Sequence, residues 1–449
     1  MKFRTIDISA IEDFRLGNAD SRAKGTGCTV IVCDKGAVGG VDVRGGAPAT
    51  RETDLLRSEN TVELIHAVVL SGGSVFGLEA ASGTARELSS RGIGGEYFKM
   101  NVPVVCGASL FDLGVGDGKA FPDVEMGIEA TRNAFRGAFK TGNCGAGTGA
   151  TVGKANGIKY AMKSGLGSFA CADDKLQVGA VAAVNAYGDV YNGAGNIIAG
   201  LRSRDGNSIY GTIKTLKERV YEDDKEDSIV IIDTPEPEFE SSHDSRHDTD
   251  KSLRMTRIIQ ALNDEYRKSS GIPSEQIDEA MVYSSSKPEP KEEPEETKIP
   301  KAHIVLPDTE PDTDDRSDNI REFLDSVGGE PIDKVRTDDA EFVEDAPEMG
   351  YDIPFNTTLG CLITNAKLTK SQANKLATIL HDAYARAIKP VHSTQDGDTI
   401  FVLASGKQEV NFDAFAALAT DVMQYAIINS VTSAKAAYGL PSANEIKAE

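Results

Sequence analysis

The chain has 449 residues, with 70 acidic against 48 basic side chains and a formal net charge of −22. Residues 221–350 concentrate that charge, since they hold 38 acidic and 15 basic side chains and 11 of the 17 prolines. A negative chain with no Lys/Arg cluster lacks the phosphate-neutralising surface of a nucleic-acid-binding protein, so we expect no nucleic-acid partner.

The N-terminal sequence MKFRTIDISAIEDF has no apolar run of signal-peptide length. No stretch approaches the roughly 18 uninterrupted apolar residues of a membrane span. We therefore expect a cytoplasmic protein with no membrane partner. The six cysteines are scattered without a CxxC pair, which predicts buried, reduced thiols.

The N-terminal part is predicted to be rich in strands. Residues 27–43 contain two β-rich runs around a Lys35-Gly36 turn, which predicts a hairpin. A short apolar strand is predicted at 66–70, after which Ser74 is expected to cap a helix that runs to about residue 90. Apolar and helical patterns further along the chain predict strands at 101–110, 165–171 and 177–185 and a helix at 123–136.

The C-terminal part is predicted to be a β-α-β-α unit. A continuous apolar run predicts a buried strand at 357–366, and helical spacing of apolar residues predicts a helix at 369–388. A strand at 398–404 and a long apolar helix from 412 to about 434 follow. Early hairpins and two long late helices favour an α+β layered sandwich over a doubly wound parallel sheet.

The acidic stretch separates two parts of the chain. We predict a large-chain part at 1–220, an acidic, proline-rich insert at 221–350 and a small-chain part at 351–449. The charge and proline content of the insert predict a mostly flexible segment. Within it, short strands at 228–233 and 303–307 and a helical island near 253–262 are expected. Solubility, a lid over a site and a docking segment all stay open as its role.

Two motifs that suggest cofactors do not meet the requirements of those sites. The segment GAGTGATVGK at 145–154 lacks the Gly six residues before its Lys and the Ser or Thr after it that a phosphate loop needs. HDSRH at 243–247 has Asp244 where the zinc-protease pattern has Glu. We therefore expect no metal and no cofactor.

The end of the acidic stretch carries the candidate chemistry. Thr357 opens an apolar strand, which is compatible with ordinary strand-edge chemistry. It could also attack the carbonyl carbon of Asn356, shift the acyl group from nitrogen to oxygen and be freed as a new N-terminus by ester hydrolysis. An N-terminal Thr has a nucleophilic hydroxyl and an α-amine, with a pKa of about 7.7 to 8.0, as its own general base. The neighbouring Thr358 leaves the bond ambiguous by one residue.

Six segments along the chain carry a family resemblance: SGGSVFGLEAASG (71–83), VPVVCGASLFDLG (102–114), GAGTGATVGK (145–154), VGAVAAVNAYGDV (178–190), NTTLGCLITNAKLT (356–369) and HSTQDGDTIFVLASG (392–406). In this order they resemble the self-cleaving L-aminopeptidase/D-esterase family, peptidase family S58, which includes β-peptidyl aminopeptidases and the nylon-oligomer hydrolases. The resemblance leaves the insert unmatched.

The resemblance implies a four-layer αββα sandwich of the N-terminal-nucleophile type, cleaved between Asn356 and Thr357. Thr357 corresponds to the nucleophile, and its supporting residues correspond to Lys154, Asn185, Asp396 and Asp398. The Lys and the Asp-Gly-Asp spacing are closer to the nylon-oligomer-hydrolase branch than to the aminopeptidase branch. We also expect substrate contacts at Gly72, Gly73, Gly147 and Thr148.

Each supporting residue has a physically sensible role and a structural alternative. Asp396 and Asp398 could hold the Thr357 ammonium, or form a solvated Asp-Gly turn. Lys154 could lower the pKa of the Thr357 hydroxyl, or be a surface lysine. Asn185 ends an apolar strand, where its amide is costly to bury unpaired, and could donate to a tetrahedral oxyanion.

The expected function is amide hydrolysis of small peptides, amino-acid amides or ω-amino-acid oligomers. An acyltransferase of the ornithine-acetyltransferase type, with the same Thr nucleophile, is the alternative. A third possibility is a non-enzymatic protein whose functional part is the acidic insert. The resemblance also implies a homo-oligomer, a tetramer of processed αβ pairs.

Overall fold

The structure of the protein, a computed structural model, describes residues 3–220 and 356–446. All of these residues belong to one compact unit. The strands predicted at 228–233 and 303–307 and the helical island near 253–262 lie outside the described residues.

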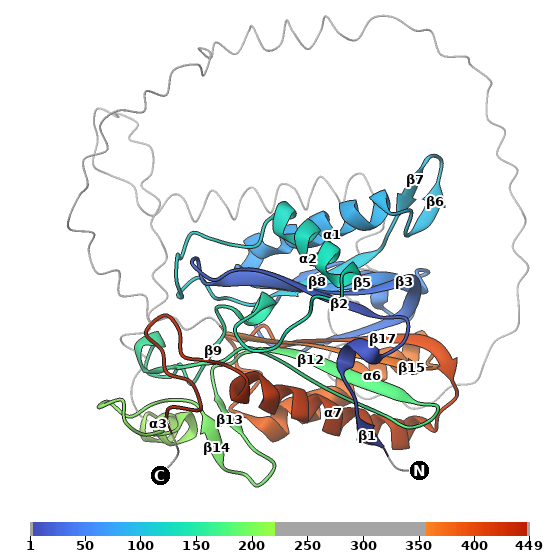
Figure 1. Cartoon of the computed structure of the whole chain (residues 1–449). Helices are drawn as coiled ribbons and strands as arrows, with labels where there is room; N and C mark the ends of the chain where they lie inside the picture. The colour runs from blue at the N-terminus through green and yellow to red at the C-terminus, as the bar shows by residue number, and fades with distance from the viewer. Residues whose placement is uncertain (1–2, 221–355, 447–449) are drawn as a thin grey trace, which may run out of the picture. The chain divides into compact units, whose positions relative to one another are not determined.

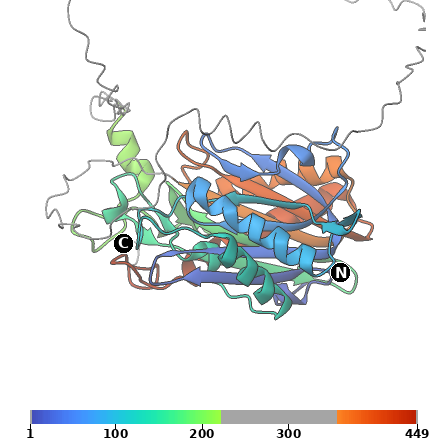
Figure 2. The same ribbon diagram turned by 90° about the horizontal axis from the view of Figure 1, so that it is seen from above.

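The described chain forms four layers (Figure 1). Two helices cover a sheet region made of the early strands: α1 (Glu79–Ser90), α2 (Val124–Phe135), β2 (Arg15–Ser21), β3 (Thr26–Val43), β4 (Ala49–Arg51), β5 (Leu64–Ser71) and β8 (Val105–Ser109). Seen from above, α1 and α2 lie side by side over these strands (Figure 2). The second sheet region and its two helices are β1 (Arg4–Thr5), β11 (Leu166–Ala172), β12 (Gln177–Asn185), β15 (Thr357–Ala366), β17 (Thr399–Gln408), α6 (Lys370–Ala387) and α7 (Phe412–Thr432). The expected αββα sandwich is confirmed.

Short elements decorate this framework. Three small sheets pair β6 with β7, β9 with β10, and β13 with both β14 and β16. These strands and the short helix α3 are β6 (Gly95–Tyr97), β7 (Met100–Val102), β9 (Thr151–Val152), β10 (Met162–Lys163), β13 (Asp189–Tyr191), β14 (Ile197–Ala199), β16 (Ile388–Lys389) and α3 (Thr212–Glu218). Single 3-10 turns are η1 (Ile8–Ala10), η2 (Asp54–Leu56), η3 (Ser74–Leu78), η4 (Gly145–Gly147) and η5 (Ile158–Tyr160).

Strand β3 belongs to both sheet regions. Its first half pairs with β2 and with β5, while its last residues, Val38 to Val43, pair antiparallel with β17. A register shift between Val32 and Ala37 marks the bend between the halves. The predicted hairpin at 27–43 is therefore wrong, because the irregularity at this turn bends the strand instead of reversing it, and other strands supply the partners of both halves.

Three cores fill the spaces between the layers, and the strand period of two assigns residues to them. Along β15, Leu359, Cys361 and Ile363 belong to the core between the two sheet regions. Leu362 and Ala366, on the opposite face, belong to the core under α6 and α7. A third, smaller core lies under α1 and α2. Both faces of β15 are thus buried, which explains its continuous apolar sequence.

The C-terminal elements follow the predicted β-α-β-α order. β15 and β17 pair in parallel, with α6 as the crossover between them. Thr369 caps α6 in a capping box with Gln372, which fixes where the helix begins. Helix α7 has the length and hydropathy of a membrane span. However, 56% of its apolar 18-residue segment is buried inside the protein, where α7 packs on the sheet as a core helix.

Two N-terminal details differ from the predictions. The helical segment after β5 does run to Ser90, but Ser74 does not cap it. Ser74 has a φ of 53° and follows Gly73, which is the N-cap of η3 without a side-chain hydrogen bond. Strand β2 was not predicted, because its sequence RLGNADS is too polar and glycine-containing to show strand alternation.

Close packing of α7 on β11 depends on Gly167. A Cβ at this position would lie 2.0 Å from the carbonyl oxygen of Ala426 and 2.3 Å from the amide nitrogen of Ser430, both in α7. We predict that Gly167→Ala lowers the free energy of unfolding by about 1 to 3 kcal/mol, because backbone atoms cannot move aside cheaply. Urea unfolding followed by circular dichroism measures this change.

Gly193 provides the matched control, because a Cβ there meets nothing within 4 Å. Gly193→Ala should leave the unfolding midpoint unchanged. Equal midpoints for the two variants would contradict the assigned contact between α7 and β11.

Candidate active site

The candidate residues meet at one end of the second sheet region. β12 ends at Asn185, β15 begins at Thr357, and the two residues are direct partners in the antiparallel pairing of these strands. The loop that carries Asp396 and Asp398 leads into the neighbouring strand β17, which begins at Thr399. The fold thus brings together segments that are far apart in the sequence.

Strand alternation separates the two neighbouring threonines. Thr357 lies on the face of Leu359 and Cys361, toward the space between the two sheet regions, with Asn185 opposite it. Thr358 lies on the other face, opposite Val184, which belongs to the core under α6 and α7. Of the two threonines, only Thr357 therefore has its side chain on the same face as Asn185.

The Thr357 hydroxyl lies against the peptide bond that precedes it. Its Oγ1 donates to the carbonyl oxygen of Asn356. The backbone N–H of Gly397 donates to the same oxygen over 3.0 Å. A Cβ on Gly397 would lie 2.5 Å from Thr357 Oγ1, so a glycine is needed there for the hydroxyl to occupy its position.

Lys154 is buried in a cage of oxygen atoms. Its Nζ donates over 2.8 Å to Asn185 Oδ1 and over 3.2 Å to the Asn185 carbonyl. It also donates to the carbonyl and the hydroxyl of Thr151, over 3.0 and 3.1 Å. Asn185 Nδ2 donates to the carbonyl of Phe111 over 2.8 Å, which fixes the orientation of the amide. Lys154 is not a surface lysine, and it is joined to Asn185 directly.

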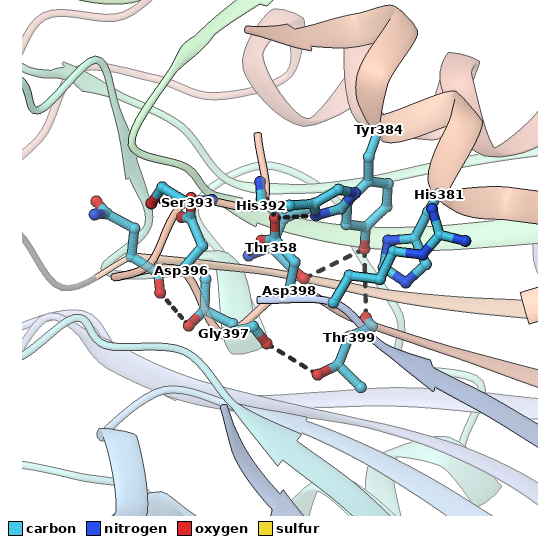
Figure 3. Close-up of polar contacts among 12 residues, drawn as sticks. Thr358, His381, Tyr384, His392, Ser393, Asp396, Gly397, Asp398 and Thr399 are labelled. Atoms are coloured by element: carbon cyan, nitrogen blue, oxygen red, sulfur yellow. Dashed lines mark hydrogen bonds and ion pairs between the residues drawn. The ribbon is translucent and has the colours of Figure 1, made fainter. Parts of the chain in front are cut away.

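Asp396 and Asp398 are both buried and bind different partners across Gly397. Asp396 Oδ2 accepts from the backbone N–H and the hydroxyl of Ser393, over 2.9 and 2.6 Å. Asp398 Oδ1 accepts from the backbone N–H of Thr358 over 2.7 Å, and its Oδ2 accepts from His392 (Figure 3). Asp396 Oδ1 is buried and has no hydrogen-bond partner among the described residues. The segment is not a solvated turn.

Burial shifts the pKa values of two side chains of this site toward neutral pH. Desolvation raises the pKa of Asp396 to about 6, with a further contribution from the negative charge of Asp398. Desolvation lowers the pKa of Lys154 to about 7, against the opposing effect of the Asp396 carboxylate. Such values are typical of groups that exchange protons at a functional site.

The four predicted substrate-contact residues lie in two turns. The N–H of Gly73 donates to Asp112 Oδ1 over 2.7 Å, and a Cβ on Gly72 would collide with the same carboxylate. In η4, the N–H groups of Gly147 and Thr148 donate within their own turn, over 3.0 and 3.1 Å. Their contact with a substrate stays a prediction.

A second buried pair of charges supports these turns. Asp112 also accepts from the Thr26 hydroxyl over 2.9 Å, and desolvation raises its pKa to about 6. Lys163 Nζ donates to the carbonyls of Gly147, Ala150 and Ser164, and desolvation lowers its pKa to about 7. Asp112 thus links the turn at Gly73 to the Thr26 side chain, and Lys163 links the turn at Gly147 to neighbouring backbone carbonyls.

Sequence reasoning missed Thr151, Asp112, Lys163, His392 and Ser393. Asp112 follows directly after an apolar strand, and His392 and Ser393 lie in the HSTQDGD segment; these signals could have pointed to them. Lys163 and Thr151 have no comparable signal. In the described part of the chain, no group of three or more His, Cys, Asp or Glu side chains has the arrangement of a metal site.

Comparison with known families confirms the resemblance. The sequence profile of peptidase family S58 matches residues 7–237 and 318–443. It therefore extends into both ends of the acidic stretch, further than the six segments indicate.

Relatives carry two kinds of description. An uncharacterized aminopeptidase of Mycobacterium leprae (strain TN) is 40% identical over 201 residues, which are 42% of this chain and 54% of that protein. An uncharacterized aminopeptidase of Mycobacterium bovis is 27% identical over 431 residues, 93% of this chain and 88% of that protein. A 6-aminohexanoate-oligomer endohydrolase of Kocuria sp. is 30% identical over 187 residues, 41% of this chain and 49% of that protein. The first and third alignments span about half the length of those relatives.

Solved structures share the fold. The L-aminopeptidase D-Ala-esterase/amidase of Ochrobactrum anthropi, described as a variant of the Ntn-hydrolase fold, aligns with a TM-score of 0.50 at 13% identity, covering 95% of this chain and 86% of its own. A β-aminopeptidase of Burkholderia sp. aligns with a TM-score of 0.51 at 13% identity, covering 98% and 92%. These likenesses confirm the expected N-terminal-nucleophile fold.

The raised pKa of Asp112 predicts a pH-dependent stability difference. Between pH 3.8 and about 6 the folded chain holds a proton on this carboxyl that the unfolded chain has lost, so Asp112 weakens folding as pH rises through that window. Asp112→Asn lacks this ionisation, and the Thr26 hydroxyl can reverse its hydrogen bond. We predict that the variant gains about 2 kcal/mol relative to wild type between pH 4.5 and pH 7.5.

Urea unfolding at four pH values across that range measures the difference. Asp117→Asn is the control, because Asp117 is an exposed residue of the same loop region. A difference between Asp112→Asn and wild type that stays constant with pH would show that Asp112 titrates normally.

Proposed function

The chain belongs to peptidase family S58, and from that membership we propose that it is a self-processing amide hydrolase whose nucleophile is Thr357. The observation that carries the proposal is the contact of Thr357 Oγ1 with the Asn356 peptide group, whose carbonyl oxygen already accepts from the Gly397 N–H over 3.0 Å. A nucleophile and a donor to the developing oxyanion thus lie at the same peptide bond.

This geometry supports self-processing in two steps. Oγ1 of Thr357 attacks the carbonyl carbon of Asn356, and the carbonyl oxygen becomes an oxyanion that the Gly397 N–H stabilises. Collapse of the intermediate breaks the C–N bond, leaving an ester on Oγ1 and an amine on Thr357, which takes up the hydroxyl proton. Water hydrolyses the ester, which gives Asn356 a free carboxylate and Thr357 a free α-amine and hydroxyl.

After self-cleavage, Thr357 and three neighbouring side chains serve substrate hydrolysis. The Thr357 α-amine acts as general base for its own hydroxyl, as in other N-terminal-nucleophile enzymes. Asp396 Oδ1, which has no partner among the described residues, is an acceptor for the α-ammonium. Asn185 Nδ2 uses one hydrogen on Phe111 and keeps the other for the substrate oxyanion. Lys154 holds Asn185 in that orientation.

We propose small amides with a free amino end as the substrate class. This rests on two groups of relatives, named as aminopeptidases and as 6-aminohexanoate-oligomer endohydrolases. An aminopeptidase acts at the amino end of a peptide, and a 6-aminohexanoate oligomer likewise has an amino group at one end. α-Peptides, β-peptides and ω-amino-acid oligomers all have this arrangement.

Mass spectrometry can identify the bond that breaks. Intact-mass spectrometry of purified wild-type protein should give two chains, 1–356 and 357–449. Thr357→Ala should stay in one piece because it lacks the attacking oxygen. One intact chain from active wild-type protein would refute the proposal.

Thr358→Val is the matched control for the neighbouring residue. Thr358 Oγ1 has no hydrogen-bond partner among the described residues and lies on the other face of β15, so this variant should still be cut between Asn356 and Thr357. Cleavage lost in Thr358→Val and kept in Thr357→Ala would transfer the nucleophile to Thr358.

Processing should also depend on Gly397. Gly397→Ala should slow processing at least about 100-fold, because its Cβ would displace the Thr357 hydroxyl from the carbonyl carbon. The time course of chain cleavage after synthesis, followed on denaturing gels, measures the rate, with Gly193→Ala as the control. Normal processing of Gly397→Ala would mean that the hydroxyl reacts from another position.

A substrate panel tests the reaction class. p-Nitroanilides of L-α- and β-amino acids and oligomers of 6-aminohexanoate should be hydrolysed by wild-type protein and left intact by Thr357→Ala. Acetyl transfer from N-acetylornithine to glutamate, with no amide hydrolysed, would instead identify the acyltransferase alternative.

A further inference from the structure

We propose that His392 is a positioning residue that fixes the Asp398 carboxylate and, through it, the first residues of β15. The inference rests on the proposed function and adds to it a residue outside the expected catalytic set. His392 lies in the loop before β17, in the same turn as Asp396 and Asp398 (Figure 3).

Two donors of His392 bind one oxygen of Asp398. The ring Nδ1 lies 2.8 Å from Asp398 Oδ2, and the backbone nitrogen lies 3.1 Å from the same atom. A carboxylate can only accept, so this contact requires a proton on Nδ1. The Asp398 side chain is 1% exposed and that of His392 is 19% exposed, so little water competes for this contact.

The backbone of His392 is held in an unusual conformation. Its φ is 56°, in the left-handed region that costs most residues other than glycine roughly 1 kcal/mol or more. Histidine, asparagine and aspartate are enriched there. The conformation presents the ring and the backbone N–H of one residue to one carboxylate oxygen, so the contact with Asp398 offsets the strain.

The second oxygen of Asp398 passes this constraint to the nucleophile strand. Asp398 Oδ1 accepts the Thr358 N–H over 2.7 Å, directly after Thr357. The Tyr384 hydroxyl lies 3.3 Å from the carbonyl of Thr358 and 3.4 Å from that of Thr399, where it bridges β15 and β17. The hydrogen bonds that connect His392 to Asp398 and Asp398 to Thr358 therefore fix the position of Thr357.

Neighbouring rings fix the position of the His392 ring. It packs edge-on against His381, with ring centroids 4.7 Å apart, and lies 6.1 Å from the ring of Tyr384. Burial lowers the pKa of His381 to about 4, and its Nε2 lies 3.2 Å from the carbonyl of Asp42. His381 is thus neutral near pH 7 and packs against His392 without adding a charge.

The test compares two substitutions that separate the ring donor from the backbone conformation. His392→Asn keeps a left-handed conformation accessible and places an amide N–H near the position of Nδ1. His392→Gly removes the ring donor and relieves the strain, but keeps the backbone N–H. We expect His392→Gly to slow processing and lower kcat about 10- to 100-fold, and His392→Asn to stay within about threefold of wild type.

The pH profile supplies a readout that a loss of packing alone would not change. The ionisable groups around the Asp398 carboxylate are His392, Asp396, Lys154 and Tyr384, with His381 and Asp42 behind His392. A carboxylate that loses a hydrogen-bond donor is protonated at higher pH. The acid limb of kcat in His392→Gly should move to higher pH, while that of His392→Asn should not.

A spectroscopic measurement in uncleaved Thr357→Ala protein does not depend on the reaction. Nitrogen-15 spectra of the histidine rings should show a proton on Nδ1 of His392, identified by its loss in His392→Asn. A ring protonated only on Nε2 would overturn the inference, as would equal rates for the two His392 variants. Absence of processing in wild-type protein would instead remove the proposed function.

Discussion

The register of β15 against β12 is the constraint on which the site depends. Thr357 is the partner of Asn185, and the period of two along the strand then turns Thr357 toward the space between the sheets and Thr358 toward the helices. A shift by one residue would exchange the two threonines and expose each apolar side chain of β15 to the wrong core. The cores on both faces therefore hold Thr357 in register, so that the energy of folding also orients the hydroxyl that we propose as the nucleophile.

The site combines this packing with charges that are expensive to bury. Lys154 and Lys163 lie among backbone and side-chain oxygens, and Asp112 and Asp396 accept hydrogen bonds from backbone N–H groups and hydroxyls. These contacts offset part of the desolvation cost, and the remainder appears as pKa values of about 6 for the acids and about 7 for the lysines. The pKa values of these four side chains therefore lie close to neutral pH, where small changes in their surroundings alter their protonation.

The sequence alone predicted those helices and strands whose hydrophobic pattern fits only one type of secondary structure. The strand at 357–366 and the helices near 369–388 and 412–434 are long and strongly apolar or periodic, and they formed as predicted. The turn at Lys35-Gly36 was misread, because local sequence cannot distinguish a bend in a strand from a reversal when the pairing partners come from elsewhere. The juxtaposition of Lys154, Asn185 and the loop at Asp396 was available only through family resemblance, since no local pattern records contacts between segments so far apart. Asp112, Lys163 and His392 were missed because a single charged residue or histidine has the same appearance in sequence whether it is buried or solvated.

Strand β3 gives the molecule a mechanical property as well as a topology. One uninterrupted backbone hydrogen-bonds to β5 in one sheet region and to β17 in the other. Just beyond its end, the N–H groups of Arg44 and Ala47 donate to the carbonyls of Asp398 and Asp396. The two sheet regions beside Thr357 thus share one strand, so they cannot separate as independent bodies. The spacing of the two sheet regions is therefore fixed when the chain folds, before any ligand binds.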